Sequence, residues 1–189
     1  PGFPNLIGFG RWNMEIPEQT LTNMIIYQIG ALDIFCKKHD VIMQHVKPHG
    51  NLNNMADTNT SIATSIVEAV QSVNSNLPLF VKPNSELERI AKRKGQPYVL
   101  ELFADRAYNK DLPLVPRHQE NAVITDSQVA AQRVIQMVKE NTITAITGET
   151  IRVEGKTICV HGDTPSAIEL IKDIRKLLEI ENIKIGSHV

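Results

Sequence analysis

The chain has 189 residues, 42% of them hydrophobic and 22% charged, and its formal net charge at pH 7 is −1. This composition is typical of a globular protein with one substantial core and excludes a disordered tail. The scattered Lys and Arg residues argue against a surface that follows nucleic-acid phosphates. No apolar run approaches the roughly 18 to 20 residues that cross a bilayer, and no basic-then-apolar leader opens the chain, so we expect no membrane or nucleic-acid partner.

The two cysteines and the first residues of the chain support two further expectations. Cys36 and Cys159 lie in periodic apolar segments without CxxC spacing, which favours reduced, buried thiols in the cytoplasm over a disulfide or a zinc site. The opening "PGFPNLIGFGRW" has no initiating methionine and is typical of a loop that follows a strand. We therefore expect the chain to be a fragment.

The first half of the chain alternates between helical and strand-like patterns. Apolar residues at helical spacing predict a helix from Pro17 to about Lys38. The apolar run 41–46, closed by Pro48 and Gly50, predicts a buried strand that ends in a loop. A helical face over 62–73 and a short apolar run over 77–81 then repeat the alternation.

The third helix and the third strand follow directly. Ser85 and Glu88 have the spacing of a capping box for a short helix that ends at Gly95. The segment "PYVLELF" (97–103) predicts a strand, and "ADRAYNKD" is its polar exit.

The second half continues the pattern. Asp126 is a plausible N-cap for a helix over 126–138, and the turn-rich span 147–156 predicts a small hairpin. "TICVHGD" (157–163) predicts a fourth strand, followed by a helix that Thr164 and Pro165 cap and start. "NIKIG" (182–186) predicts a fifth strand.

This order of elements predicts the fold class. Strands separated by helices of ten or more residues require right-handed parallel crossovers, and hence an α/β sheet or barrel. Neither GxGxxG nor GxxxxGK[ST] occurs in the sequence, so neither a dinucleotide-binding fold nor a P-loop is supported. A β/α barrel is the better interpretation.

In such a barrel the chemistry gathers at the carboxyl ends of the strands. Seven ionisable residues lie on or just after the predicted strands: Lys47, His49, Glu101, Asp105, Arg106, His161 and Asp163. A packed core does not need ionisable groups at one end of its strands. We therefore expect these side chains to converge in a single pocket.

Each cluster also has a purely structural interpretation. Lys47, His49 and Asn54 could bind an anion, move a proton and orient a carbonyl; alternatively, Lys47 caps a strand end and His49 bonds a loop carbonyl.

The other two clusters have similar alternatives. Glu101, Asp105 and Arg106 place charges in and beside a buried strand, where an internal Glu–Arg pair would serve stability alone. In His161-Gly162-Asp163, Asp163 could merely cap the following helix. His49, His161 and Asp163 could approach one another, but no HxxxH or HxxE spacing places two ligands on one element, so no metal site is expected.

Five blocks of the sequence resemble, in the same order, motifs of the LamB/YcsF lactam-utilisation family. They are "PGFPNLIGFGRWNM", "IYQIGAL", "QHVKPHGNLNN", "ELFADRAYNKDLPLVPR" and "ICVHGDTPSAIELIKDIRKLLE". The resemblance extends over essentially the whole chain.

The resemblance implies a fold and an activity. The fold is a (β/α)7-type barrel akin to the glycoside hydrolase/deacetylase fold, with residues 1–189 forming one N-terminally truncated barrel domain whose first strands are missing. The activity is that of an ATP-dependent cyclic-amide hydrolase that opens 5-oxo-L-proline to L-glutamate together with two partners, subunits B and C. ATP binding by one member of the complex is implied as well.

The chemistry that the resemblance implies is consistent with functional roles for the polar residues at the strand exits. From it we infer catalytic roles for Lys47, His49, Glu101, Asp105, His161 and Asp163, and substrate binding by Asn54, Arg106 and Gly50.

This sequence departs from the family pattern in three places. The N-terminal segments "DLNCDLGE" and "CGFHAGDP" and the histidine before "PGFP" do not occur here. Asn53 stands where the usual "GALYN" loop has tyrosine, and Asp111-Leu112 lacks the usual glycine of "DG".

Two other classes of function stay open on the sequence alone. One is a metal-dependent, deacetylase-like hydrolase that acts without ATP. The other is a non-catalytic module that binds a small carboxylate. A homo-oligomer is compatible with each of these functions.

Overall fold

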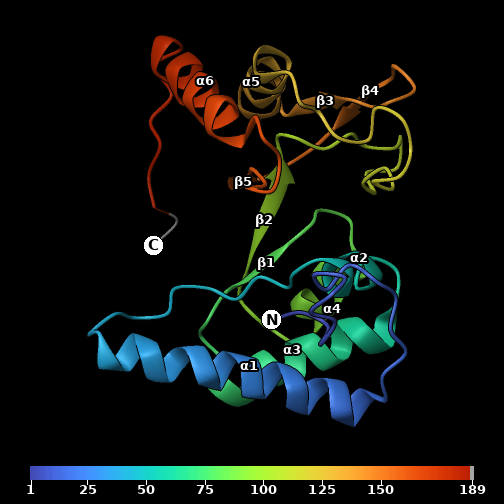
Figure 1. Ribbon diagram of the computed structural model, residues 1–189, viewed down its shortest axis with the longest axis vertical. Helices are drawn as coiled ribbons and strands as arrows, with labels where there is room; N and C mark the ends of the chain where they lie inside the picture. The colour runs from blue at the N-terminus through green and yellow to red at the C-terminus, as the bar shows by residue number, and fades with distance from the viewer. Residues whose placement is uncertain (188–189) are drawn as a thin grey trace. The chain divides into compact units, whose positions relative to one another are not determined.

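The computed structural model describes residues 1–187, and the chain forms two compact units, Pro1–Val99 and Leu100–Val189. Strand β2 (Tyr98–Phe103) begins in the first unit and continues into the second. Its neighbours are β1 (Leu79–Val81) and β5 (Thr157–Cys159), in the order β1-β2-β5 (Figure 1). The predicted α/β class with parallel strands is confirmed.

The first unit is mainly helical. Besides β1 it contains α1 (Glu18–Lys38), α2 (Asn51–Met55), α3 (Thr60–Asn74) and α4 (Glu86–Arg93). The predicted helix from Pro17 to about Lys38 is confirmed, and α1 packs along α3 (Figure 1). Ile25 of α1 and Ile66 of α3 are completely or almost completely buried, so apolar burial on one face of each helix stabilises this pair.

The cap of α4 agrees with the sequence. The Ser85 hydroxyl accepts a hydrogen bond from the Glu88 amide at 3.1 Å, as predicted. The Glu88 carboxylate reaches back one residue further than a capping box requires, because it accepts from the Asn84 amide at 2.7 Å. The first bond satisfies an amide that the helix start leaves without an intrahelical partner, and the second fixes the residue just before the N-cap.

The buried strand predicted over 41–46 is wrong. Val41 and Ile42 are 58% and 85% exposed, and within the described residues the pairing with β1 is a single parallel bridge between Val46 and Leu79. The Val46 amide donates to the Pro78 carbonyl, and the Val46 carbonyl accepts from the Phe80 amide, both at 2.9 Å. An apolar run becomes a strand only where a neighbour offers backbone partners, and here one position has them.

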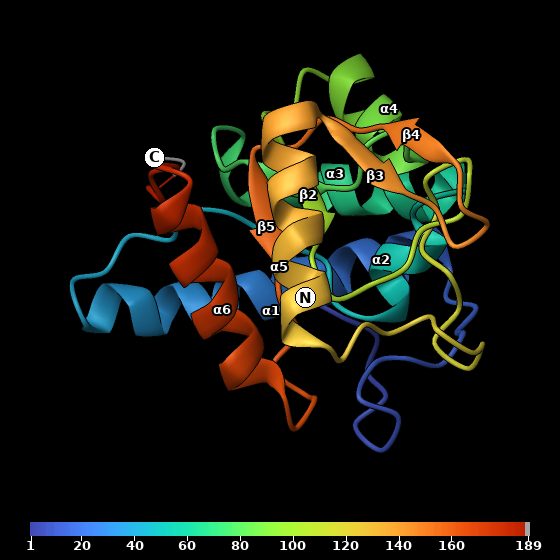
Figure 2. The same cartoon turned by 90° about the horizontal axis from the view of Figure 1, so that it is seen from above.

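The second unit is built on the parallel pair β2–β5, in which Glu101 lies opposite Thr157 and Phe103 opposite Cys159. Its helices are α5 (Ser127–Ile135), a π-helical turn η1 (Gln136–Glu140) and α6 (Ala167–Ile180). Helices α5 and α6 lie side by side (Figure 2) and share a buried cluster that includes Val134 and Leu170. The N-cap at Asp126 is confirmed by two bonds from backbone amides to its carboxylate, each 2.9 Å long.

The hairpin and the chain end differ from the sequence-based expectation. The antiparallel hairpin consists of β3 (Thr142–Thr144) and β4 (Thr150–Arg152), so it starts before the predicted span. The strand predicted over 182–186 is wrong, because this segment has no strand partner within the described residues. Instead the Ile183 amide donates to the Leu178 carbonyl at 2.8 Å and closes the end of α6.

Two further observations bear on the sequence-based expectations. Neither Cys36 nor Cys159 forms a disulfide within residues 1–187, and each is partly exposed rather than buried. Among residues 1–187, no helix combines the length and the apolar character that a bilayer span requires.

Candidate active site

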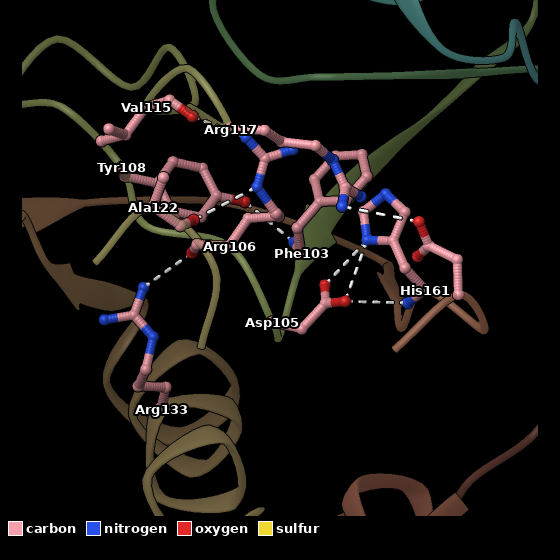
Figure 3. Close-up of polar contacts among 10 residues, drawn as sticks. Phe103, Asp105, Arg106, Tyr108, Val115, Arg117, Ala122, Arg133 and His161 are labelled. Atoms are coloured by element: carbon pink, nitrogen blue, oxygen red, sulfur yellow. Dashed lines mark hydrogen bonds and ion pairs between the residues drawn. The ribbon is translucent and has the colours of Figure 1, made fainter. Parts of the chain in front are cut away.

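The exits of β2 and β5 bring Asp105 and His161 together. Because Phe103 and Cys159 are register partners in a parallel pair, residues two positions beyond them leave the sheet at the same edge. The His161 Nδ1 atom lies 2.9 Å from Asp105 Oδ1 and 3.0 Å from Oδ2, and the His161 amide donates to Oδ2 at 3.0 Å (Figure 3). The structure thus brings two of the predicted site residues into direct contact, and their catalytic roles stay predictions.

The charge of Asp105 determines what His161 can do. Burial raises the pKa of Asp105, but hydrogen bonds from the side chain and the backbone of His161 outweigh it, and the pKa lies below its ordinary value. Asp105 is therefore an acceptor at neutral pH, and His161 Nδ1 must carry the proton. The lone pair of the neutral ring is then on Nε2. With the Asp105 side chain 1% exposed and that of His161 24% exposed, a buried carboxylate orients a base that solvent can reach.

Aromatic side chains fix the imidazole ring. The ring of Phe103 stacks on that of His161, with centroids 5.6 Å apart and an interplanar angle of 22°. The Phe103 amide in turn donates to the Tyr108 hydroxyl oxygen at 2.8 Å. Burial raises the pKa of Tyr108, so its hydroxyl stays protonated. Packing and a hydrogen bond thus restrict the ring to one orientation.

Asp163 lies two residues beyond His161 and forms an ion pair with Arg117, with Nη1 and Oδ2 separated by 3.6 Å. Arg117 was missed by the sequence-based prediction. Its segment "LPLVPR" belongs to the same family-like block as Asp105 and Arg106. Membership of that block was the sequence signal that could have identified Arg117.

Arg106 has a structural task in the loop after β2. Its side chain is buried, with Nη2 donating to the Val115 carbonyl at 2.6 Å and Nε to the Ala122 carbonyl at 3.3 Å. Its own carbonyl accepts from Arg133 Nη2 at 3.1 Å. These bonds hold two distant points of the loop together. Substrate binding by Arg106 stays a prediction.

Glu101 is buried within β2, opposite Thr157 in the register with β5. It lies two residues before Phe103 on the strand, so both residues belong to the same face. A catalytic role for Glu101 also stays a prediction.

In the first unit, the loop after residue 46 is held against the first residues of the chain. The His49 amide donates to the Pro1 carbonyl at 2.7 Å, and the His49 ring meets Phe9 edge to face at 4.9 Å. The Asn51 amide donates to the Gly10 carbonyl at 2.8 Å. These contacts position His49, and the catalytic roles of Lys47 and His49 remain predictions.

Gly50 is required by the close approach within this loop. Its φ is 60° and its ψ is −131°, and a Cβ atom at this position would lie 2.6 Å from the Gly10 carbonyl oxygen. An L-residue would therefore meet both backbone strain and a steric clash. This backbone requirement is a sufficient reason for glycine, independent of the substrate contact that the sequence suggested.

Replacing Gly50 by alanine should therefore destabilise the protein by about 2 to 4 kcal/mol. The midpoint of urea unfolding measures this change. Gly95→Ala is a useful comparison, since Gly95 also has positive φ but its Cβ would meet open space. A Gly50→Ala protein no less stable than Gly95→Ala would contradict the steric argument.

Asn54 is exposed, but its side chain contacts the buried Lys82, a residue that the sequence-based prediction did not include. Its side-chain oxygen accepts from Lys82 Nζ at 3.0 Å, and Lys82 Nζ also lies 2.5 Å from Asp57 Oδ2. The side chains of Lys82 and Asp57 are 5% and 14% exposed. Lys82 directly follows β1, so the expectation that functional side chains gather at the carboxyl ends of strands also applied to Lys82.

The structure thus places the predicted residues in two groups. Asp105 and His161 are in direct contact in the second unit, with Asp163 on the same turn. Lys47, His49, Gly50 and Asn54 lie within eight consecutive residues of the first unit. Their convergence in one pocket stays a prediction. No group of three or more His, Cys, Asp or Glu residues within 1–187 is placed to hold a metal ion.

Comparison with known proteins gives a consistent result. The model of the LamB/YcsF family matches residues 1–188. The A subunit of 5-oxoprolinase from Clostridium beijerinckii is 49% identical over 98% of this chain and 72% of its own length. The protein of the same name from Pyrococcus abyssi is 45% identical over the same shares.

A solved structure is similar over the same region. The crystal structure of the lactam utilization protein from Thermus thermophilus superposes with a TM-score of 0.92 at 37% identity, covering 98% of this chain and 74% of that one. The resemblance seen in the five sequence blocks is confirmed, and the chain belongs to the LamB/YcsF family.

Proposed function

We propose that this chain is the A subunit of an ATP-dependent 5-oxoprolinase, which opens 5-oxo-L-proline to L-glutamate together with subunits B and C. The contact of Asp105 with His161 is the observation that carries the proposal. The relatives are named as A subunits of 5-oxoprolinase, and these names support the choice of substrate and of a multi-subunit enzyme.

In this mechanism His161 acts as a general base. Its Nε2 atom accepts a proton from the water that attacks the lactam carbonyl carbon, while Asp105 stabilises the imidazolium that forms. The new carbon–oxygen bond produces a tetrahedral centre, and breaking the carbon–nitrogen bond opens the ring. The imidazolium returns its proton to the leaving nitrogen.

The roles proposed for the other residues rest on the sequence. In the first unit these roles are anion stabilisation by Lys47 and substrate binding by Asn54 and Gly50. His49, Glu101 and Asp163 position groups or handle protons. The parallel pairing of β2 with β5 supports a (β/α)7 barrel domain, to which this chain contributes part of the strands.

ATP enters the proposal as the energy source of the complex, since phosphorylation of the lactam oxygen would favour ring opening. The connection from β1 to α4 does not fit nucleotide phosphates. The first amides of α4 already donate to carbonyls of the chain, Glu86 to Asp57 at 2.8 Å and Leu87 to Ala56 at 3.1 Å. We place the complex in the cytoplasm, which two cysteines in the reduced, thiol form support.

The decisive experiment measures glutamate release from 5-oxo-L-proline by the full-length protein mixed with its B and C partners. We expect ATP-dependent release well above that of the partners alone. Asp105→Asn should lower it about 10²- to 10⁴-fold, because an amide no longer fixes the required tautomer. Asp173→Asn is the matched control, since Asp173 accepts hydrogen bonds from Ser127 and Gln128 away from the dyad.

The same assay separates the alternatives. Turnover that needs a divalent metal but no ATP would favour a deacetylase-like hydrolase. Ligand binding without any turnover that depends on Asp105 would favour a non-catalytic module. Either result would overturn the proposed function.

A further inference from the structure

The ion pair between Arg117 and Asp163 is loose enough to exchange. Its 3.6 Å separation exceeds the roughly 2.7 to 2.9 Å of a charge-assisted hydrogen bond, and the two side chains are 27% and 34% exposed. A partly solvated ion pair of this length has little net stability. An incoming anion can therefore replace Asp163 on Arg117.

The backbone that carries Arg117 is firmly positioned. Arg106 bonds the carbonyls of Val115 and Ala122, one on each side of Arg117 in the chain. Ala107 reinforces both points, because its carbonyl accepts from the Val115 amide and its amide donates to the Ala122 carbonyl, each at 3.0 Å. The guanidinium of Arg117 thus extends from a fixed segment, which lowers the entropic cost of binding a ligand.

Arg106 and Arg117 differ in what they can offer a substrate. The side chain of Arg106 is buried and donates to two backbone carbonyls, so it acts as a brace for the loop. Arg117 is more exposed, and its planar fork of N–H donors matches the two oxygens of a carboxylate. Of these two arginines, Arg117 is the better carboxylate receptor.

The location of the ion pair connects it with the proposed chemistry. Asp163 is two residues from His161, so Arg117 is tied to the turn that carries the base. In 5-oxoproline the carboxylate and the lactam carbonyl lie on the two carbons that flank the ring nitrogen. A cation that holds the carboxylate near this turn would therefore bring the carbonyl toward His161.

We propose that Arg117 binds the carboxylate of the lactam substrate, and that this carboxylate displaces Asp163 from Arg117 on binding. The inference rests on the proposed function, since that function supplies the acidic lactam. It assigns a direct contact with the substrate to Arg117, whereas the sequence suggested Arg106 for substrate binding. Arg106 becomes the positioning residue of Arg117.

The first test compares two substrates in the full-length three-subunit enzyme: 5-oxo-L-proline and its uncharged amide, 5-oxo-L-prolinamide. Arg117→Gln should raise KM for the acid about 10- to 100-fold, with a smaller change in kcat, and should leave kcat/KM for the amide nearly unchanged. Arg117→Lys should recover part of the loss, since it restores the charge without the fork. Arg89→Gln, which removes an exposed arginine that pairs with Glu86, is the control.

Equal losses for the acid and the amide would overturn the proposal, because they would indicate a structural role. An unchanged ratio of kcat/KM for the acid to kcat/KM for the amide would overturn it as well.

A second measurement separates this inference from the proposed function. Calorimetric binding of 5-oxo-L-proline and of its amide to the full-length protein, without ATP, does not depend on turnover. Arg117→Gln should weaken binding of the acid alone, and Asp163→Asn should tighten it by removing the competing charge. Acid binding that either variant leaves unchanged would contradict the displacement, even where the complete enzyme releases glutamate.

Discussion

Replacing His161 by glutamine should lower the kcat of the complete enzyme about 10²- to 10⁴-fold. Glutamine is similar in size and can still donate to Asp105, but it cannot accept a proton at neutral pH. The His161 side chain is partly exposed, so we expect the melting temperature to change little. Steady-state glutamate release and a thermal scan on the same preparation measure both quantities.

His39→Gln is the matched control for this prediction. His39 is an exposed residue at the C-cap of α1, far along the chain from the dyad, and its backbone amide makes the cap bonds. The same chemical change should leave kcat unaltered there. A fall in kcat for His161→Gln that is matched by a fall in melting temperature would indicate a structural role and contradict the assignment of a base.

Replacing Asp57 by alanine should destabilise the protein by about 3 to 5 kcal/mol, because it leaves the Lys82 ammonium buried without this partner charge. Lys82→Met should cost less. Asp57 is the more exposed member of the pair, and burial already raises its pKa, so its carboxyl group can become neutral. Urea unfolding of both variants and the parent measures the difference.

The pH dependence of Lys82→Met provides a second check. Because the pKa of Asp57 is higher in the folded than in the unfolded protein, ionising this carboxyl group lowers the free energy of unfolding, whereas the protonated group lowers it little. The stability deficit of Lys82→Met should therefore be smallest at acidic pH and grow as the pH rises through the ordinary Asp range and the raised pKa. A deficit that shrinks with rising pH would contradict this account.

The fold was predictable where local chemistry decides the structure. Asp126 and Ser85 cap their helices as expected, because a cap needs only a side-chain acceptor and the next few amides. The runs 41–46 and 182–186 failed as strands because strand formation depends on partners that the local sequence does not specify. Apolar character indicated burial, but Ile42 and Ile185 are exposed.

The candidate site was predictable to a similar extent. Asp105 and His161 were found because parallel register brings the exits of neighbouring strands together. Lys82 follows a strand in the same way and was missed because its partner, Asp57, comes from a separate turn. Arg117 was not predictable by this rule, since its place depends on the tertiary bonds of Arg106.

The bracing of the loop by Arg106 has an evolutionary consequence. The Arg106 guanidinium donates to the carbonyls of Val115 and Ala122. Both ends of the six-residue segment between them, here called the cassette, are therefore fixed whichever residues the segment contains. His161 and its carboxylate partner Asp105 lie on strand exits outside this cassette. Mutations within 116–121 could therefore change which acid is recognised without changing the contact between Asp105 and His161. Relatives with the same dyad and a different cassette would be candidates for enzymes that open other cyclic amides.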